Sequence, residues 1–280
     1  MSPQREIGAI GIDFGASRIK IAHRDGEKPE EFRCFPTGAR SEVAEWARSQ
    51  AGIPIGLTGA GATSFAGQEG IVGRVVDEFT AWATGSRPLL RRAQLSVDEP
   101  FLLVSLGTGT SVLRVEPHAV TRVGGTSLGG GTLMGLAALI CDCRDFDTLR
   151  ELAARGDRRQ VDLVLADLYP PEHSPLLGDA TASSFARIAV SEAAAKADIS
   201  HRAAGLMGLL GENIGLLASA LARAENVLDV VFGGSVLRDN PTLTGLLQGL
   251  LAVHGQRAHL LPEGEYAGAM GALLAATVPR

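Results

Sequence analysis

The sequence is short of aromatic residues and of basic charge, and these shortages exclude a class of protein. Only 5% of its 280 residues are aromatic, with two Trp and two Tyr among them. Lys and Arg number 26 against 31 Asp and Glu, which leaves a net charge of −5. Proteins that bind nucleic acid usually carry a basic stripe and stacking aromatics. We therefore expect no nucleic-acid partner, and small molecules as ligands.

Cysteine is equally scarce. Cys34, Cys141 and Cys143 are an odd, sparse set and cannot form a disulfide framework. The C-x-C pair formed by Cys141 and Cys143 has too few ligands for a zinc site, and none of the six histidines has metal-ligand spacing. The start of the sequence, MSPQREIGAIG, lacks the apolar core of a signal peptide, so we expect a cytoplasmic protein.

One uncharged run, Val123 to Cys141, is long enough to suggest a membrane span. It contains six glycines, three of them consecutive, which suit the interior of a membrane helix poorly. A glycine-rich loop that leads into a buried helix from about Leu133 fits better. We therefore expect no membrane partner.

Glycine is abundant, with 35 residues that cluster after apolar runs. The run Ile7–Ile12 ends at Asp13-Phe14-Gly15, and a second apolar segment follows at once. The run Phe101–Leu106 ends at Gly107-Thr-Gly-Thr-Ser111, and here too a second apolar segment follows at once. Each pattern predicts a β-hairpin with a tight glycine turn. Two such hairpins, each opening a β-rich half, predict duplicated α/β domains that face each other across a cleft.

The other elements follow from periodicity and turn residues. A stretch rich in Pro, Arg and polar residues, Ser86–Glu99, predicts the joint between the domains. We assign residues 1–90 to the first domain and 96–264 to the second, with the final helix, 265–280, packed on the first. Further strands are expected at 53–57, 72–76, 112–115, 120–123, 227–232 and 258–261. Helices are expected at 41–50 (with Ser41 as N-cap), 147–168, 183–195, 199–225 and 267–276, and a loop at the prolines 170, 171 and 175.

Both glycine turns have groups that suit an anion. Backbone N–H groups at a tight turn form an anion-binding concavity, to which Ser17 adds a hydroxyl and Lys20 a charge. Thr108 and Thr110 supply hydroxyls at the second turn. Asp13 could hold Mg²⁺ through water. Each turn alone has an ordinary structural interpretation, but two together could clamp a triphosphate, which predicts a nucleotide ligand.

Three further features each allow two interpretations. The glycine-rich stretch Gly124–Leu133 precedes a helix, whose N-terminal N–H groups could bind an anion or could only allow tight packing. It is neither a Walker A motif nor a dinucleotide fingerprint. Arg122 could hold a carboxylate or phosphate, or form a surface ion pair. Of the adjacent Asp77 and Glu78, one could be a general base and the other a helix cap.

These motifs together resemble the type II pantothenate kinases, a branch of the actin/hexokinase-like ATPases. The resemblance runs nearly end to end. It is carried by Leu106-Gly-Thr-Gly-Thr-Ser111, by Arg122-Val-Gly-Gly-Thr-Ser-Leu-Gly-Gly-Gly-Thr-Leu-Met-Gly135 and by Gly178-Asp-Ala-Thr-Ala-Ser183, in the family's order and spacing.

The resemblance implies two ribonuclease H-like domains with ATP in the cleft between them. It implies Mg²⁺- and ATP-dependent phosphorylation of pantothenate to 4′-phosphopantothenate, the first step of coenzyme A biosynthesis. Coenzyme A or an acyl-CoA would be an inhibitor. By resemblance the protein is a homodimer, in which the region Leu260–Pro262 reaches the partner's substrate pocket.

The family's functional residues map onto this sequence by motif. The resemblance implies Glu78 as catalytic base and Arg122, Thr181 and Ala182 as pantothenate contacts. The residues that match ATP-contacting segments are Gly15, Ala16, Ser17, Lys20, Gly107, Thr108, Gly109, Thr110, Gly130, Gly131, Thr132, Leu133, Met134, Phe146 and Ser235.

The sequence departs from the family at two points. Its first loop reads Gly15-Ala16-Ser17 where Gly-Gly-Thr is usual, and an aromatic residue common near Leu261 is missing. Two alternatives therefore stay open. One is a kinase of the same scaffold that acts on another small hydroxylated acceptor, and the other is an inactive regulatory protein that binds a nucleotide or acyl-CoA.

Overall fold

The computed structural model describes residues 8–26, 28, 30–50, 52–169 and 180–278. Two five-stranded sheets organise the chain. The first contains β1 (Ala9–Phe14), β2 (Arg18–Arg24), β3 (Glu31–Pro36), β4 (Ile55–Thr58) and β5 (Arg74–Val75). The second contains β6 (Phe101–Leu106), β7 (Thr110–Val115), β8 (Val120–Thr126), β11 (Asp229–Gly233) and β12 (Arg257–Leu260). A short antiparallel pair joins β9 (Leu163–Val164) to β10 (Thr181–Ser183).

The two sheets have the same topology. The first has the order β3-β2-β1-β4-β5, and the second, read from its hairpin edge, has the order β8-β7-β6-β11-β12. In each, three antiparallel strands come first in the chain, and two strands then add in parallel on the other side of the first strand. This is the ribonuclease H-like pattern, and it confirms the duplicated α/β fold that the two glycine hairpins predicted.

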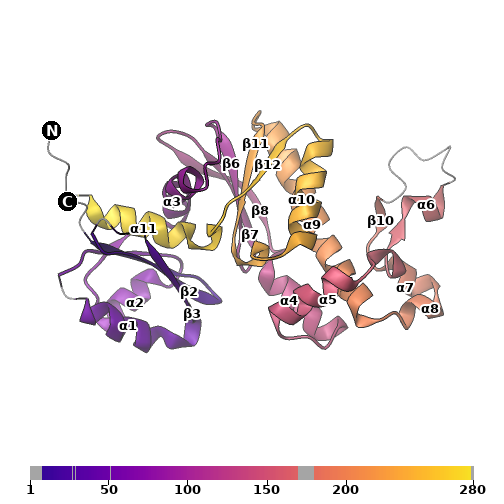
Figure 1. Cartoon of the computed structure of the whole chain (residues 1–280), viewed down its shortest axis with the longest axis horizontal. Coiled ribbons are helices and arrows are strands. Elements are labelled where there is room, and N and C mark those ends of the chain that lie inside the picture. The colour runs from indigo at the N-terminus through magenta and orange to yellow at the C-terminus, as the bar shows by residue number, and fades with distance from the viewer. Residues whose placement is uncertain (1–7, 27, 29, 51, 170–179, 279–280) are drawn as a thin grey trace.

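Helices cover both faces of the first sheet and link it to the second (Figure 1). α1 (Arg40–Ser49) and α2 (Ala62–Glu69) lie on one face, and the C-terminal helix α11 (Ala267–Thr277) lies on the other. α3 (Glu78–Arg92) packs against α11 and, through Trp82, Leu89 and Leu90, against the apolar face of the second sheet.

The opposite face of the second sheet holds the largest core. Leu102, Val104 and Phe232 pack there against α4 (Gly130–Ile140), α5 (Phe146–Arg155), α9 (Ile199–Ala224) and α10 (Pro241–Val253). Strand residues alternate between the faces, so Leu103 contacts the α3 side while its neighbours contact the α9 side. Beyond α5 and α9, the β9–β10 pair with α6 (Leu165–Leu168), α7 (Ala186–Val190) and α8 (Glu192–Ala195) forms a distal lobe (Figure 1).

The long helix α9 is apolar over most of its length. Within the described ranges it alone is long and apolar enough to cross a membrane, but 61% of its most apolar window is buried inside the protein. The core helix of a globular protein has the same character. The uncharged run Val123–Cys141 is divided between the end of β8 and α4, as a strand, a glycine-rich turn and a helix.

Two details predicted near the first domain differ from the structure. Ser41 is not an N-cap, because α1 already begins at Arg40 and has no side-chain cap. The stretch Ser86–Glu99 is not all linker, because α3 continues through Pro88 to Arg92. Burial of Leu89 and Leu90 against the second sheet stabilises this extension enough to offset the hydrogen bond that proline removes.

The helix predictions between residues 130 and 195 also need correction. The predicted helix 147–168 ends at Arg155, where Gly156 packs so closely that a Cβ would lie 1.9 Å from the Ser200 carbonyl oxygen. The predicted helix 183–195 is instead β10 followed by the short helices α7 and α8. α4 begins at Gly130, three residues before the predicted Leu133. The proline-rich loop predicted at 170–175 lies outside the described residues.

Helix α11 reaches its neighbours at backbone contact distance because they present glycines. A Cβ on Gly11 of β1 would lie 1.9 Å from the Ala269 carbonyl oxygen, and one on Gly56 of β4 would lie 1.9 Å from that of Ala272. Gly85 of α3 is equally tight, with the Ala267 carbonyl oxygen at 1.9 Å. α11 is therefore fixed against the first sheet and α3 at once.

This packing makes a prediction about stability. Gly85→Ala should destabilise the protein by about 3 kcal/mol or more, because the clash is with backbone that cannot rotate away. Gly67→Ala, in the exposed part of α2 with nothing within 4 Å, is the matched control. It should stabilise by about 0.5 to 1 kcal/mol through helix propensity. Urea unfolding gives the free energy of unfolding of each variant. Equal free energies for Gly85→Ala and Gly67→Ala would contradict the close packing of α11.

Candidate active site

A cavity of about 680 Å³ lies where the two hairpin tips meet. Its size suits a small ligand such as a nucleotide. The first sheet contributes the β1–β2 turn, and the second contributes the β6–β7 turn and the end of β11. Of the residues singled out from sequence, the lining includes Asp13, Gly15, Ala16, Ser17, Lys20, Glu78, Gly107, Thr108, Gly109, Thr110, Arg122, Gly130, Gly131, Met134, Phe146 and Ser235.

The two hairpin tips are in direct contact. The hydroxyl oxygens of Ser17 and Thr108 are 2.9 Å apart, a hydrogen bond between residues 91 positions apart in the chain. Thr37 supports the first tip by donating to the Ala16 carbonyl oxygen at 3.2 Å. Ala16 does not have a positive φ, so the Cβ that replaces the family's usual glycine causes no backbone strain. The loops predicted to clamp a ligand therefore share one cavity.

Helix α4 holds the second tip by its N-terminus. The backbone N–H of Gly130 donates to the Gly107 carbonyl oxygen at 2.8 Å, and that of Gly131 donates to Thr108 at 2.9 Å. A Cβ on Gly129 would lie 2.6 Å from the Gly109 Cα, so the contact requires glycine. Because these N–H groups are already bonded, they are not a free anion site. This favours the tight-packing interpretation of the glycine-rich stretch.

Asp13 lies at the end of β1, on the floor of the cavity. Its carboxylate is almost fully buried, and its nearest cation is Lys20, whose Nζ lies 3.8 Å from Oδ2. Gly59, with φ of +85°, leaves space beside Oδ1, where a Cβ would lie at 2.6 Å. Burial raises the pKa of Asp13, and the charge of Lys20 partly offsets this effect.

The adjacent Asp77 and Glu78 lie in different positions, and Asp77 is the one that forms the predicted helix cap. Asp77 is the N-cap of α3 and accepts from the Thr80 backbone N–H at 3.0 Å. Glu78 is the first residue of α3 and lines the cavity. Burial raises the pKa of Glu78, the negative charges of Asp13 and Asp77 raise it further, and Lys20 lowers it. A carboxylate with a raised pKa beside a cavity is suited to accept a proton.

Basic and apolar groups surround the rest of the cavity. Arg122 extends from the edge strand β8 and makes no ion pair within the part of the chain that the structure describes. Its guanidinium is therefore available to an anionic ligand. Phe146, Met134 and Ser235 line the cavity with Arg144 and Arg238, of which Arg238 is paired with the buried Glu265 at 3.4 Å.

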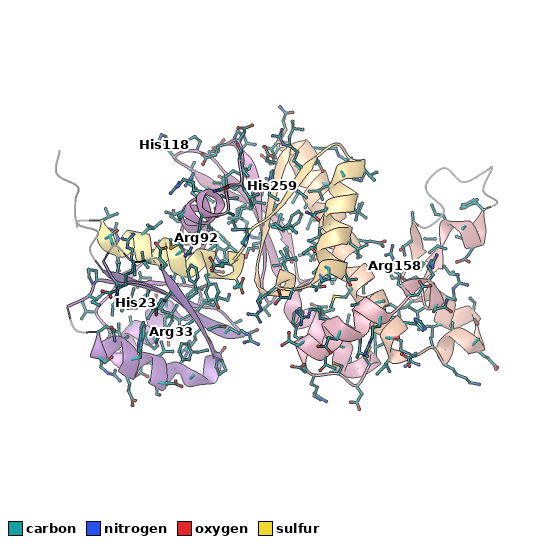
Figure 2. The ribbon with its side chains drawn as sticks, in the orientation of Figure 1. His23, Arg33, Arg92, His118, Arg158 and His259 are labelled. Carbon is teal, nitrogen blue, oxygen red and sulfur yellow. The ribbon has the colours of Figure 1, made fainter. Side chains whose placement is uncertain are left out.

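Four residues singled out from sequence do not line this cavity. Thr132 instead donates its hydroxyl to the Ser127 carbonyl oxygen at 2.7 Å, and Leu133 is buried in the core. Thr181 and Ala182 lie in β10 of the distal lobe. There Thr181 donates to Glu212 at 2.9 Å, and Glu212 in turn pairs with Arg158, labelled in Figure 2.

Leu261 is also buried in its own core, so its side chain does not point outward.

Sequence reasoning missed several residues that line the cavity, above all Trp82. It follows Glu78 by four positions on α3, a spacing that places two side chains on one helix face, so the signal was present. Arg144 and Arg238 gave no such signal, because they come from loops whose course depends on the tertiary fold. The other missed residues are Ala60, Ser105, Asp145, Asp147 and Val236, whereas Arg18, Ser111 and Thr126 lie within the glycine-rich segments already singled out.

Solved structures share this architecture. Component A of the (R)-2-hydroxyglutaryl-CoA dehydratase of Acidaminococcus fermentans matches with a TM-score of 0.64 and 20% identity, covering 96% of this chain and 97% of that one. A ROK family glucokinase from Streptomyces griseus, solved with glucose and AMPPNP, matches with a TM-score of 0.57 and 16% identity. The match covers 96% of this chain and 98% of that one. The fold is thus that of the actin/hexokinase-like ATPases.

The sequence comparisons identify the family within that class. The Fumble family model matches residues 38–275. A type II pantothenate kinase of Bacillus cereus is 31% identical over 273 residues, covering 96% of this chain and 98% of the relative. One from Staphylococcus haemolyticus is 29% identical over 264 residues, covering 94% and 98%. The chain belongs to the type II pantothenate kinase (Fumble) family, which confirms the resemblance drawn from the motifs.

The electrostatics of the cavity make a prediction of their own. In Lys20→Met, the pKa of Glu78 should rise further, because the one cation that lowers it is removed while Asp13 and Asp77 remain. Carbon-13 NMR of side-chain-labelled glutamate, with the signal assigned by its loss in Glu78→Gln, measures this pKa in both proteins. An unchanged titration in Lys20→Met would contradict the coupling between these groups.

Proposed function

We propose that the protein transfers the γ-phosphoryl group of ATP to the terminal hydroxyl of pantothenate, giving ADP and 4′-phosphopantothenate. The observation that carries this proposal is the single cavity in which Glu78, Asp13 and Lys20 lie beside two touching glycine-rich turns. Family membership supports pantothenate as the acceptor, since the relatives are named for it. By the same resemblance, this is the first step of coenzyme A biosynthesis, and we infer a cytoplasmic location.

The proposed reaction uses positioning and electrostatics more than covalent chemistry. The two hairpin turns hold the phosphates of ATP, with Ser17 and Thr108 as hydroxyl donors and Lys20 as a point charge. The hydroxyl oxygen of the acceptor bonds to the γ-phosphorus while the bond from that phosphorus to the ADP oxygen breaks. Glu78 accepts the proton that the hydroxyl loses. Met134, Phe146 and Ser235 border the part of the cavity assigned to the adenosine.

The residues present fit a magnesium ion that is held mainly by water and phosphate. Within the described residues, no three His, Cys, Asp or Glu side chains are grouped to hold a metal. Asp13 alone is a buried carboxylate at the phosphate end of the cavity. Mg²⁺ prefers such an arrangement, with one carboxylate, several waters and substrate phosphates. When bound, the ion neutralises charge on the phosphates, and Asp13 would hold it through water.

The acceptor site involves Arg122 from one subunit and Thr181 and Ala182 from its partner. Arg122 would bind the pantothenate carboxylate. Thr181 and Ala182 do not line the cavity of their own chain, so they contact the substrate only if a second copy brings them to it. One face of α9 supports a homodimer: Asn213, Leu216 and Ala220 are exposed and uncharged, with the half-buried Leu209 and Leu217 beside them. Glu212 on the same helix anchors Thr181 near this face.

Several expectations complete the proposal. The domain division at residues 1–90 and 96–264 stays a prediction from the sequence, and the packing of residues 265–280 on the first domain is supported by the contact of α11 with β1 and β4. Inhibition by coenzyme A or an acyl-CoA is a prediction from the family resemblance.

The role of Glu78 is tested by Glu78→Gln. This change keeps the shape but removes the proton acceptor, so kcat should fall roughly 10²- to 10⁴-fold while ATP still binds. A coupled ADP-release assay with Mg²⁺-ATP, with and without pantothenate, measures it. Near-wild-type turnover would contradict the role of Glu78, and pantothenate-independent ADP release by the wild type would contradict the acceptor.

The shared substrate site is tested by mixing two inactive variants. Glu78→Gln removes the base. Ala182→Trp places a large ring where Ala182 is proposed to contact the substrate, and because position 182 is exposed, the core is not disturbed. If the site is shared, each mixed dimer has one intact site, and random exchange should restore about a quarter of wild-type activity. No recovery, with mixed dimers verified by tagged pull-down, would place Ala182 in the site of its own subunit or outside any site.

A further inference from the structure

Trp82 is a buried side chain that also lines the cavity, near Glu78. Its side chain follows Glu78 by one turn of α3 and is only 4% exposed. Trp82 belongs to the same apolar cluster as Leu103, Val231 and Ala267, and a Cβ on Gly233 at the end of β11 would lie 3.4 Å from its ring, an ordinary contact distance. Trp82 is thus held in place by the second sheet and by α11.

The indole N–H of this tryptophan has no hydrogen-bond partner among the residues that the structure describes. A buried tryptophan normally bonds its N–H, which can only donate. Nε1 is not among the fully enclosed polar atoms that lack a partner, so it keeps some exposed surface, and Trp82 is one of the residues that line the cavity. The donor is rigid, unused and open to a ligand.

The position of Nε1 is fixed relative to Asp13. A Cβ placed on Gly268 would lie 3.1 Å from Nε1 and 2.7 Å from Oδ2 of Asp13, so both atoms flank the same point. Lys20 and Glu78 border this region, since both interact electrostatically with Asp13. The unused donor therefore lies where phosphoryl transfer is proposed to occur.

The chemistry of the neighbours decides what this donor binds. In the proposed reaction, the acceptor hydroxyl would give its proton to Glu78 and Asp13 would hold a hydrated cation, so neither group calls for a neutral donor. The non-bridging oxygens of the phosphoryl group accept hydrogen bonds and carry the charge that shifts during transfer. A fixed N–H directed at such an oxygen stabilises that charge without reorganisation.

We propose that Trp82 is a further catalytic residue, whose indole N–H donates a hydrogen bond to a non-bridging oxygen of the phosphoryl group in transfer. The proposal rests on the kinase function proposed above but not on the identity of the acceptor. During the step, the acceptor oxygen bonds to phosphorus, the bond from phosphorus to the ADP oxygen breaks, and the hydroxyl proton moves to Glu78. Trp82 keeps its proton throughout.

Trp82→Phe removes the N–H and keeps an aromatic ring. We expect kcat to fall about 10²- to 10³-fold with the KM for pantothenate unchanged, as for other single transition-state donors. Affinity for the β,γ-imido analogue of ATP should fall several-fold, while affinity for ADP, which lacks the γ-phosphoryl group, should not change. Calorimetry measures both affinities. Trp46→Phe is the matched control, because Trp46 is outside the cavity lining and packs against the first sheet.

Each outcome decides the proposal. An unchanged kcat, equal losses of affinity for both nucleotides, or a rise confined to the KM for pantothenate would overturn it. Should Trp82→Phe fail to fold, benzothienylalanine introduced at position 82 keeps the ring shape, replaces only the N–H by sulfur, and is held to the same criteria. The two nucleotide affinities need no acceptor, so a selective loss of the imido analogue would support Trp82 even if pantothenate proved not to be the substrate.

Discussion

The site depends on the backbone-to-backbone packing of α11. The glycines of β1, β4 and α3 let this C-terminal helix approach the first sheet and α3 together. β1 ends at Asp13, α3 begins at Glu78, and Gly268 at the start of α11 leaves room for Asp13 and Trp82 between them. One helix thereby fixes a buried carboxylate, a carboxylate with a raised pKa and an indole donor relative to each other. Because the contacts are between backbones, a single added methyl group would displace all three.

The second constraint is the meeting of the two hairpin tips. Each tip is held by its own half of the molecule, the first by Thr37 and the second by the N-terminus of α4. Among the described residues, the hydroxyl pair of Ser17 and Thr108 links the two tips, and two ligand oxygens could replace it without burying a charge. Two cations, Lys20 beside Asp13 and Arg122 from β8, line the same cavity and can face an anionic ligand. The fold thus supplies rigidity from its cores and leaves the cleft between them for the ligand.

Sequence predicted the parts of the fold that local chemistry determines. Both hairpins were found because an apolar run followed by a glycine turn has few other outcomes. The adjacency of Asp77 and Glu78 predicted that they differ in role, but it did not show which of them is the helix cap. The helix ends were harder. Gly156 ends α5 because of Ser200, 44 positions away, and α3 passes through Pro88 because Leu89 and Leu90 are buried. The family resemblance brought Thr181 and Ala182 to notice, but only the fold shows that they do not line the cavity of their own chain.

The central claim is that the cavity transfers phosphate to the terminal hydroxyl of pantothenate, and the most direct measurement is identification of the product. Purified protein would be incubated with Mg²⁺-ATP and pantothenate, and the products examined by phosphorus NMR and mass spectrometry. The account predicts one new phosphate monoester on the primary hydroxyl, formed in amounts equal to ADP. Absence of any phosphorylated pantothenate, with nucleotide binding intact, would contradict it.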